Sequence, residues 1–155
     1  MYSFFIGNNF VEFWEKMEEK EISTDQEKKV EELHWEIQRW KSDLQFMDDE
    51  LVFIDRLLGS YVFQPNTPNL FERLQDYKNR LKETKTRKQE LRGHISKHEN
   101  TLGGMLECID SECDLGYYRK HDRLRTQVCQ CLEDFQKLKS EIFNYAGGIL
   151  KKRKP

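Results

Sequence analysis

The sequence predicts an all-α protein, an antiparallel up-down-up three-helix bundle of long coiled-coil-like helices with a short N-terminal helix. A seven-residue apolar repeat runs through three successive stretches of the chain, with apolar side chains three and four residues apart. This spacing places those side chains along one face of each helix. Short connections between the stretches then require neighbouring helices to run antiparallel.

The first long helix is expected to begin near residue 25 and to end at Leu58, after a short amphipathic helix in residues 1–22. Thr24-Asp-Gln-Glu27 matches a capping box, in which the threonine and glutamate side chains satisfy free backbone N–H groups. Gly59 then allows the chain to leave the helix. The apolar repeat places these residues on one face: Val30, Leu33, Ile37, Trp40, Leu44, Met47, Leu51, Ile54 and Leu58.

The second and third helices are expected at residues 68–110 and 116–146, so that the bundle spans residues 23–148. Thr67-Pro68 is typical of a cap followed by proline at the first helical position. Gly103-Gly104 are expected to weaken the second helix, because a glycine costs about 1 kcal/mol inside a helix. Residues 149–155 are expected to form a basic, disordered tail.

Polar residues interrupt the apolar repeat at Thr84, Lys88, His98 and His121. Isolated polar groups at such positions fix the register of a bundle at some cost in stability. If both turns are symmetric, facing residues in the first two helices have numbers that add to about 127, and those in the last two helices to about 227. This alignment brings His34 level with His94.

Composition limits the class of protein. The 155 residues are 35% charged and 37% hydrophobic with a net charge of -2, which fits one soluble domain. The mean hydropathy of -0.89 leaves no apolar run long enough for a membrane span, and the first residues lack a secretion signal, so a cytoplasmic location is expected. The four cysteines, at 108, 113, 129 and 131, are expected to be reduced.

With tryptophans in the first of three long helices, the predicted architecture resembles the spectrin-type three-helix repeats. The resemblance concerns shape alone, since no residue-level motif accompanies it. It therefore implies a fold and no particular function.

Charge is unevenly distributed along the chain. Residues 1–60 contain 7 Lys and Arg against 15 Asp and Glu, whereas residues 61–155 contain 19 against 13. This asymmetry favours lateral pairing of an acidic first helix with basic second and third helices. The alternative is a basic stripe that binds nucleic acid or an acidic partner, although stacking aromatics and nucleic-acid-binding motifs are missing from it. The stripe contains Lys78, Arg80, Lys82, Lys85, Arg87, Lys88, Arg92 and Lys97.

A second alternative is a metal-binding or small-ligand-binding bundle. His94 and His98 are four residues apart and share a helix face, as two ligands of one divalent metal ion would. The alignment above places His34 and Cys131 level with this pair, so they are the candidates for the remaining ligands of the metal ion. Only Glu31-Glu-Leu-His34 matches the Glu-x-x-His motif of di-iron bundles, which use that motif twice.

The function expected from the sequence is a non-enzymatic helical module for protein–protein interaction, by self-association such as a homodimer or by binding a partner protein. No phosphate-binding loop, nucleophile motif or catalytic triad is recognisable, no cofactor is expected, and neither nucleic acid nor membrane is the expected partner. The N-terminal segment carries more aromatic surface than it can hide by itself, either as a contact site or as a cover for the bundle end. Its aromatic residues are Phe4, Phe5, Phe10, Phe13 and Trp14.

Overall fold

The computed structural model describes residues 3–63, 68–107 and 111–152, with the backbone alone described for residues 3–10, 18–24 and 111–112. Regular structure in these ranges is entirely helical: α1 (Ser3–Leu58), α2 (Leu70–Asn100), the 3-10 helix η1 (Leu102–Glu107) and α3 (Ser111–Lys152). The prediction of an all-α bundle of three long helices is confirmed. No helix in the described part is long and apolar enough to span a membrane.

The N-terminal segment is helical, as predicted, but it runs without a break into the first long helix. α1 therefore has 56 residues, and the boundary predicted near residue 25 is wrong. Residues such as Thr24 and Asp25 disfavour a helix by only a few tenths of a kcal/mol each. That cost is too small to interrupt a helix that has good helix-forming residues on both sides.

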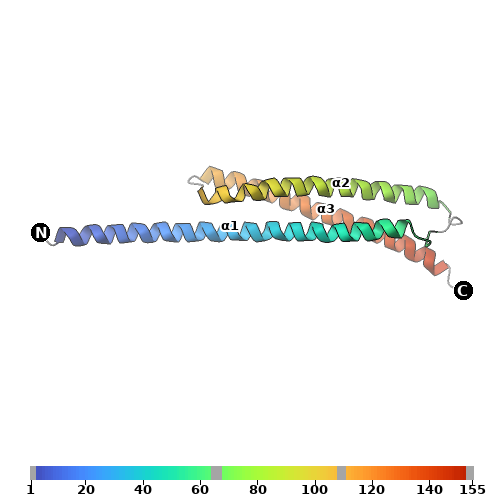
Figure 1. Ribbon diagram of the computed structural model, residues 1–155, viewed down its shortest axis with the longest axis horizontal. Coiled ribbons are helices and arrows are strands. Elements are labelled where there is room, and N and C mark those ends of the chain that lie inside the picture. Colours follow the sequence, from blue (N-terminus) through green and yellow to red (C-terminus); the bar gives the residue numbers. More distant parts are fainter. Residues whose placement is uncertain (1–2, 64–67, 108–110, 153–155) are drawn as a thin grey trace.

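α1 projects beyond the rest of the bundle at its N-terminal end. Figure 1 shows α1 and α2 side by side, α3 crossing them obliquely, and the first part of α1 extending alone past the turn between α2 and α3. Gln26 marks where the bundle begins, because its side-chain amide donates to the backbone oxygen of Met105 at 2.8 Å and to Asp114 at 3.2 Å. Residues 11–17 are all exposed. The expectation that this segment could cover the bundle end is wrong, because a straight helix carries it away.

The apolar repeat forms one continuous core. In α1 every predicted position from Leu33 to Leu58 is buried, and Val30 packs against the core. Tyr77, Leu81, Leu91 and Ile95 of α2 meet the repeat of α3 in the same core. Further buried positions in α3 are Tyr117, Leu124, Val128, Cys131, Phe135, Leu138, Ile142, Ala146 and Ile149.

The second helix ends earlier than predicted. α2 stops at Asn100, and Thr101 closes it with a backbone N–H bond to Lys97 at 3.3 Å and a side-chain bond to the His98 oxygen at 2.9 Å. The next residues form η1 rather than α-helix. η1 still buries Leu102 and Met105, so the core continues although the glycines have weakened the α-helix.

The third helix ends later than predicted. α3 begins at Ser111 and continues to Lys152, so a disordered tail from residue 149 is wrong for residues 149–152, while residues 153–155 lie outside the described ranges. Ala146 and Ile149 are buried and extend the apolar repeat of Ile142 by two more turns. Burial of Ile149 stabilises this last part of the helix despite Gly147 and Gly148.

The helices pair in a different register from the one predicted. Asp48 of α1 contacts Lys88 and Arg92 of α2, so facing residue numbers add to about 138 rather than 127. Phe63 is buried against Tyr145 of α3, with 5.9 Å between ring centroids. In the observed register Leu58 comes level with about residue 80, so α2 begins about three turns beyond the end of α1.

Charge pairing between the helices follows the asymmetry of the sequence. Acidic residues of α1 bind basic residues of both other helices, as in Glu50–Lys139 at 2.9 Å. α2 and α3 are joined by Arg80–Glu141 at 2.6 Å and Arg87–Asp134 at 2.7 Å. These partly exposed pairs each contribute little to stability, but together they penalise other registers.

The cysteines differ from the expectation of four reduced thiols. Cys113 forms a disulfide, whereas Cys129 is free and exposed and Cys131 is free and buried. Burial raises the pKa of the Cys131 thiol, which keeps it protonated in the core. Cys108 lies outside the described residues.

Lys88 provides a test of the register, because its ammonium group is buried beside Asp48. Asp48→Ala should lower the free energy of unfolding by about 3 kcal/mol, since a buried charge loses its partner. Adding Lys88→Met should restore most of that loss, because the unpaired charge is then gone. Chemical denaturation measures both variants, with Asp49→Ala at the neighbouring exposed position as the control; equal losses for Asp48→Ala and Asp49→Ala would contradict the pairing.

Candidate functional site

The structure does not bring the four predicted metal ligands together. His34 and His94 are exposed, whereas His98 and Cys131 are buried at different levels of the bundle. The register between α2 and α3 also differs from the predicted one, since His98 lies beside His121 instead of Cys131 and their numbers add to 219 rather than about 227. Among the described side chains, no group of three or more His, Cys, Asp and Glu residues is arranged to hold a metal ion.

A buried pair of histidines lies in the core instead. His98 of α2 and His121 of α3 are linked by a hydrogen bond between Nε2 and Nδ1, at 2.9 Å. Tyr117 stacks on the His98 ring, with 4.1 Å between centroids, and its hydroxyl donates to the His98 backbone oxygen at 3.0 Å. Trp40 of α1 packs against the His121 ring at 4.6 Å. The pair is therefore enclosed by aromatic side chains from α1 and α3.

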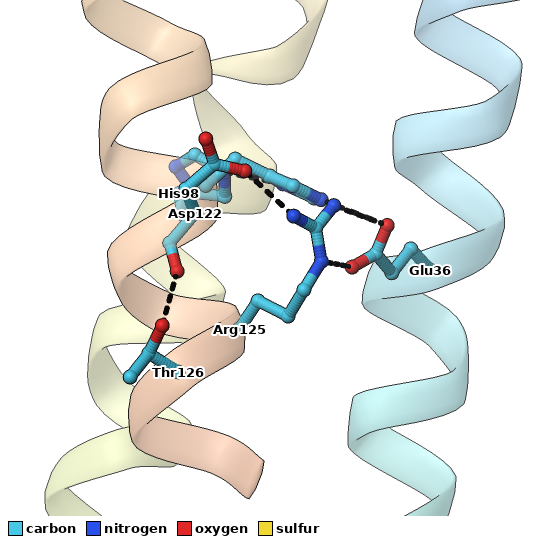
Figure 2. A network of polar contacts seen from close by, with 6 residues as sticks. Glu36, His98, Asp122, Arg125 and Thr126 are labelled. Carbon is cyan, nitrogen blue, oxygen red and sulfur yellow. Dashed lines mark hydrogen bonds and ion pairs between the residues drawn. The ribbon is translucent and has the colours of Figure 1, made fainter.

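A carboxylate and a guanidinium continue this pair to the surface. Glu36 of α1 lies 3.4 Å from Nε2 of His121 and also receives two hydrogen bonds from Arg125 of α3, one of them from Nη2 at 2.9 Å. Arg125 in turn donates to Asp122 at 2.6 Å. Figure 2 shows Arg125 reaching from α3 toward Glu36, with Asp122 and His98 nearby.

The neighbours of the pair determine its protonation. Ionised Glu36 can only accept, so the His121 nitrogen facing it carries a proton and the other His121 nitrogen accepts from His98. Burial, together with the charges of His121 and Lys120, lowers the pKa of His98 to about 4. Burial also lowers the pKa of His121, although Glu36 opposes this shift. The Arg125 hydrogen bond lowers the pKa of Glu36, so the core holds two neutral imidazoles beside a carboxylate.

The polar residues that interrupt the apolar repeat thus have partners in the structure. His98 and His121 pair with each other, Lys88 pairs with Asp48, and the Thr84 hydroxyl donates to the Arg80 backbone oxygen at 2.8 Å. His121 is fully buried, which removes the ring from contact with a substrate. This arrangement fits a role in fixing the register better than a role in general acid–base catalysis.

The predicted basic stripe is divided by its ion pairs. Lys85 lies 3.9 Å from Asp55, and Arg92 lies 2.9 Å from Asp48, both across the α1–α2 contact. Lys78 and Lys82 are exposed. Part of the basic stripe that could have bound an acidic ligand is therefore paired with acidic residues of α1.

The predicted aromatic contact site lies on the projecting part of α1. Phe13 and Trp14 are exposed there, together with Val11 and Met17. The side chains of Phe4, Phe5 and Phe10 lie outside the description.

Two surface grooves were not predicted from the sequence, because they depend on how the helices pair. Between α1 and α3, adjoining hollows of about 500 and 640 Å³ share Asp43 and Leu132. Between α2 and α3, a hollow of about 310 Å³ lies beside the buried His98. The exposed aromatic residues Trp35 and Phe46 were the only sequence signal for the first groove, since they fall outside the apolar repeat.

Comparisons with known proteins do not assign a function. No protein-family model, curated protein or solved structure matches this chain.

The buried histidines predict acid sensitivity. Folding lowers the pKa of His98 from 6.5 to about 4. Between pH 6.5 and pH 4 the unfolded chain therefore binds a proton at this histidine that the folded chain does not bind. The folded state loses stability as the pH falls through this range. Between about pH 7 and pH 5, His98 alone should lower the free energy of unfolding by about 2 kcal/mol. His98→Gln, which keeps a donor near His121, should flatten this pH dependence, whereas His94→Gln at an exposed position should leave it unchanged. Denaturation curves across this range provide the measurement, and identical slopes for wild type and His98→Gln would contradict the assignment.

Proposed function

We propose that the protein is a non-enzymatic helical interaction module that self-associates through α1. The observation that carries this proposal is the projecting N-terminal part of α1, which has exposed apolar side chains and no neighbouring helix in the described structure. A helix that stands alone in water is marginally stable, and packing of its apolar face against a partner supplies what it lacks.

The projecting segment has the character of a binding helix. Phe13 and Met17 are four residues apart and therefore lie on the same face, with exposed fractions of 59% and 40%. Val11 and Trp14, three residues apart, extend the exposed apolar surface. From Ser3 to Asp25 the segment is about 33 Å long.

A groove of matching length lies between α1 and α3. Trp35, Phe46 and Phe53 lie on nearly the same face of α1, and Trp35 and Phe46 are 65% and 66% exposed. Both also line the hollows of this groove. From Trp35 to Phe53 this face extends for about 27 Å, comparable to the projecting segment.

A second copy of the chain is the occupant that this proposal assigns to the groove. If two α1 helices run antiparallel with a two-fold axis near Val30, residue numbers that add to about 60 face each other. Trp14 of each copy then comes level with Phe46 of the other, and both contacts form at once. An amphipathic helix in an apolar groove is a common mode of recognition, and here it would complete a four-helix arrangement.

A cytoplasmic location is part of this proposal, supported by the free thiols of Cys129 and Cys131. The disulfide at Cys113 is the observation that weighs against it, because disulfides are rare in reducing compartments. Measuring the redox state of Cys113 in protein isolated under alkylating conditions distinguishes a reducing location, where the thiol is free, from an oxidising one, where the disulfide persists.

Size-exclusion chromatography with light scattering tests self-association. The full chain should be a dimer at micromolar concentration, and a chain starting at Ser23 should be a monomer. Phe46→Glu should raise the dissociation constant at least about tenfold, because it places a charge against the apolar face of the partner. Phe71→Glu is the matched control, since Phe71 is an exposed aromatic of α2 outside the groove.

Two results would contradict the proposal. A monomeric full chain at all accessible concentrations would exclude self-association. An equal loss of dimer in Phe46→Glu and Phe71→Glu would show that the α1–α3 groove is not the contact surface.

A further inference from the structure

A second hollow, on a different face, has the chemistry of an anion site. It lies between the end of α2 and the first half of α3, with a volume of about 310 Å³. The residues that line it are His94, Lys97, His98, Thr101, Lys120, Arg123, Leu124 and Gln127.

Positive charge is concentrated in this hollow without a carboxylate to balance it. Lys97, Lys120 and Arg123 all contribute to the lining, which contains no Asp or Glu. Further along the same α2–α3 contact, Arg80 and Arg87 each bind a carboxylate of α3 at 2.7 Å or less. Within the described residues, none of the three cations of the hollow forms a comparable ion pair. Gathering like charges in one place costs electrostatic energy that a bound anion would remove.

The floor of the hollow is different in character from its rim. Leu124 and His98 are 8% and 5% exposed, so the base offers an apolar side chain and a neutral imidazole held by its bond to His121. Thr101 already donates its hydroxyl to the His98 backbone oxygen, which fixes that wall. A rim of cations above a partly apolar floor suits a ligand with a charged group and a small apolar body.

We propose that this hollow binds a small phosphorylated ligand, with its phosphomonoester group between Lys97, Lys120 and Arg123 and its apolar part on Leu124. A guanidinium can bind two oxygens of one phosphate, and the two ammonium groups more than balance the remaining negative charge. The volume is at the lower end of the range for ligand pockets, which favours a small molecule over a longer polyanion. The site lies away from the α1–α3 groove and is independent of self-association.

Binding of phenyl phosphate to the full-length protein, followed by isothermal titration calorimetry, tests this site. Saturable binding with a stoichiometry of one per chain is expected, and inorganic phosphate should bind more weakly because it lacks the apolar part. The double variant Lys120→Gln and Arg123→Gln should weaken binding at least about tenfold. Lys82→Gln, which removes an exposed cation of α2 outside the hollow, should leave it unchanged.

Several outcomes would overturn the inference. Absence of saturable binding, or equal weakening by Lys82→Gln and by the double variant, would exclude a site in this hollow. Equal affinities for inorganic phosphate and phenyl phosphate would show that Leu124 does not contribute to binding. If a single-stranded oligonucleotide binds more tightly than phenyl phosphate, and the double variant loses this binding, the ligand of the hollow is a polyanion rather than a small molecule. Circular dichroism of each variant confirms that the fold is retained, as expected for changes at exposed positions.

Discussion

Polar groups placed in the core of this bundle have to find partners there, and that constraint sets the arrangement of the helices. An apolar repeat alone permits several registers, because shifting a helix by seven residues restores similar contacts. His98 and Lys88 remove this freedom, since each lies at a core position and each would be costly to bury alone. The observed register brings His98 to His121 and Lys88 to Asp48, and so satisfies both.

That register determines which surfaces remain open. With Asp48 level with Lys88, the N-terminal part of α1 extends past the turn between α2 and α3, where no described helix covers it. The oblique path of α3 leaves a groove beside α1, and exposed aromatic residues line it. The pairing of His98 with His121 places Lys97, Lys120 and Arg123 around one hollow between α2 and α3. The two candidate binding surfaces are thus consequences of how the core is aligned.

Part of the fold and little of the candidate site could be predicted from residue patterns. The three helices and the core positions of α1 follow directly from the repeat, and the polar interruptions were identifiable as unusual positions. The ends of the helices were less predictable. The capping box at Thr24 does not begin a helix here, because α1 already starts at Ser3, and Ile149 extends α3 because burial outweighs the nearby glycines. The pairing of His98 with His121 could not be predicted, since it depends on the register in which α2 and α3 pack.

The sequence by itself determined that this protein is a bundle of three long helices, which residues form its core, and that an acidic first helix faces basic neighbours. These properties are local or periodic, so they can be inferred from spacing and composition. Only the tertiary structure decided the register, the projection of α1, the partners of the buried histidines and the position of the grooves. Each of these depends on contacts between residues far apart in the chain, and the energies of alternative registers differ through a few desolvated polar groups.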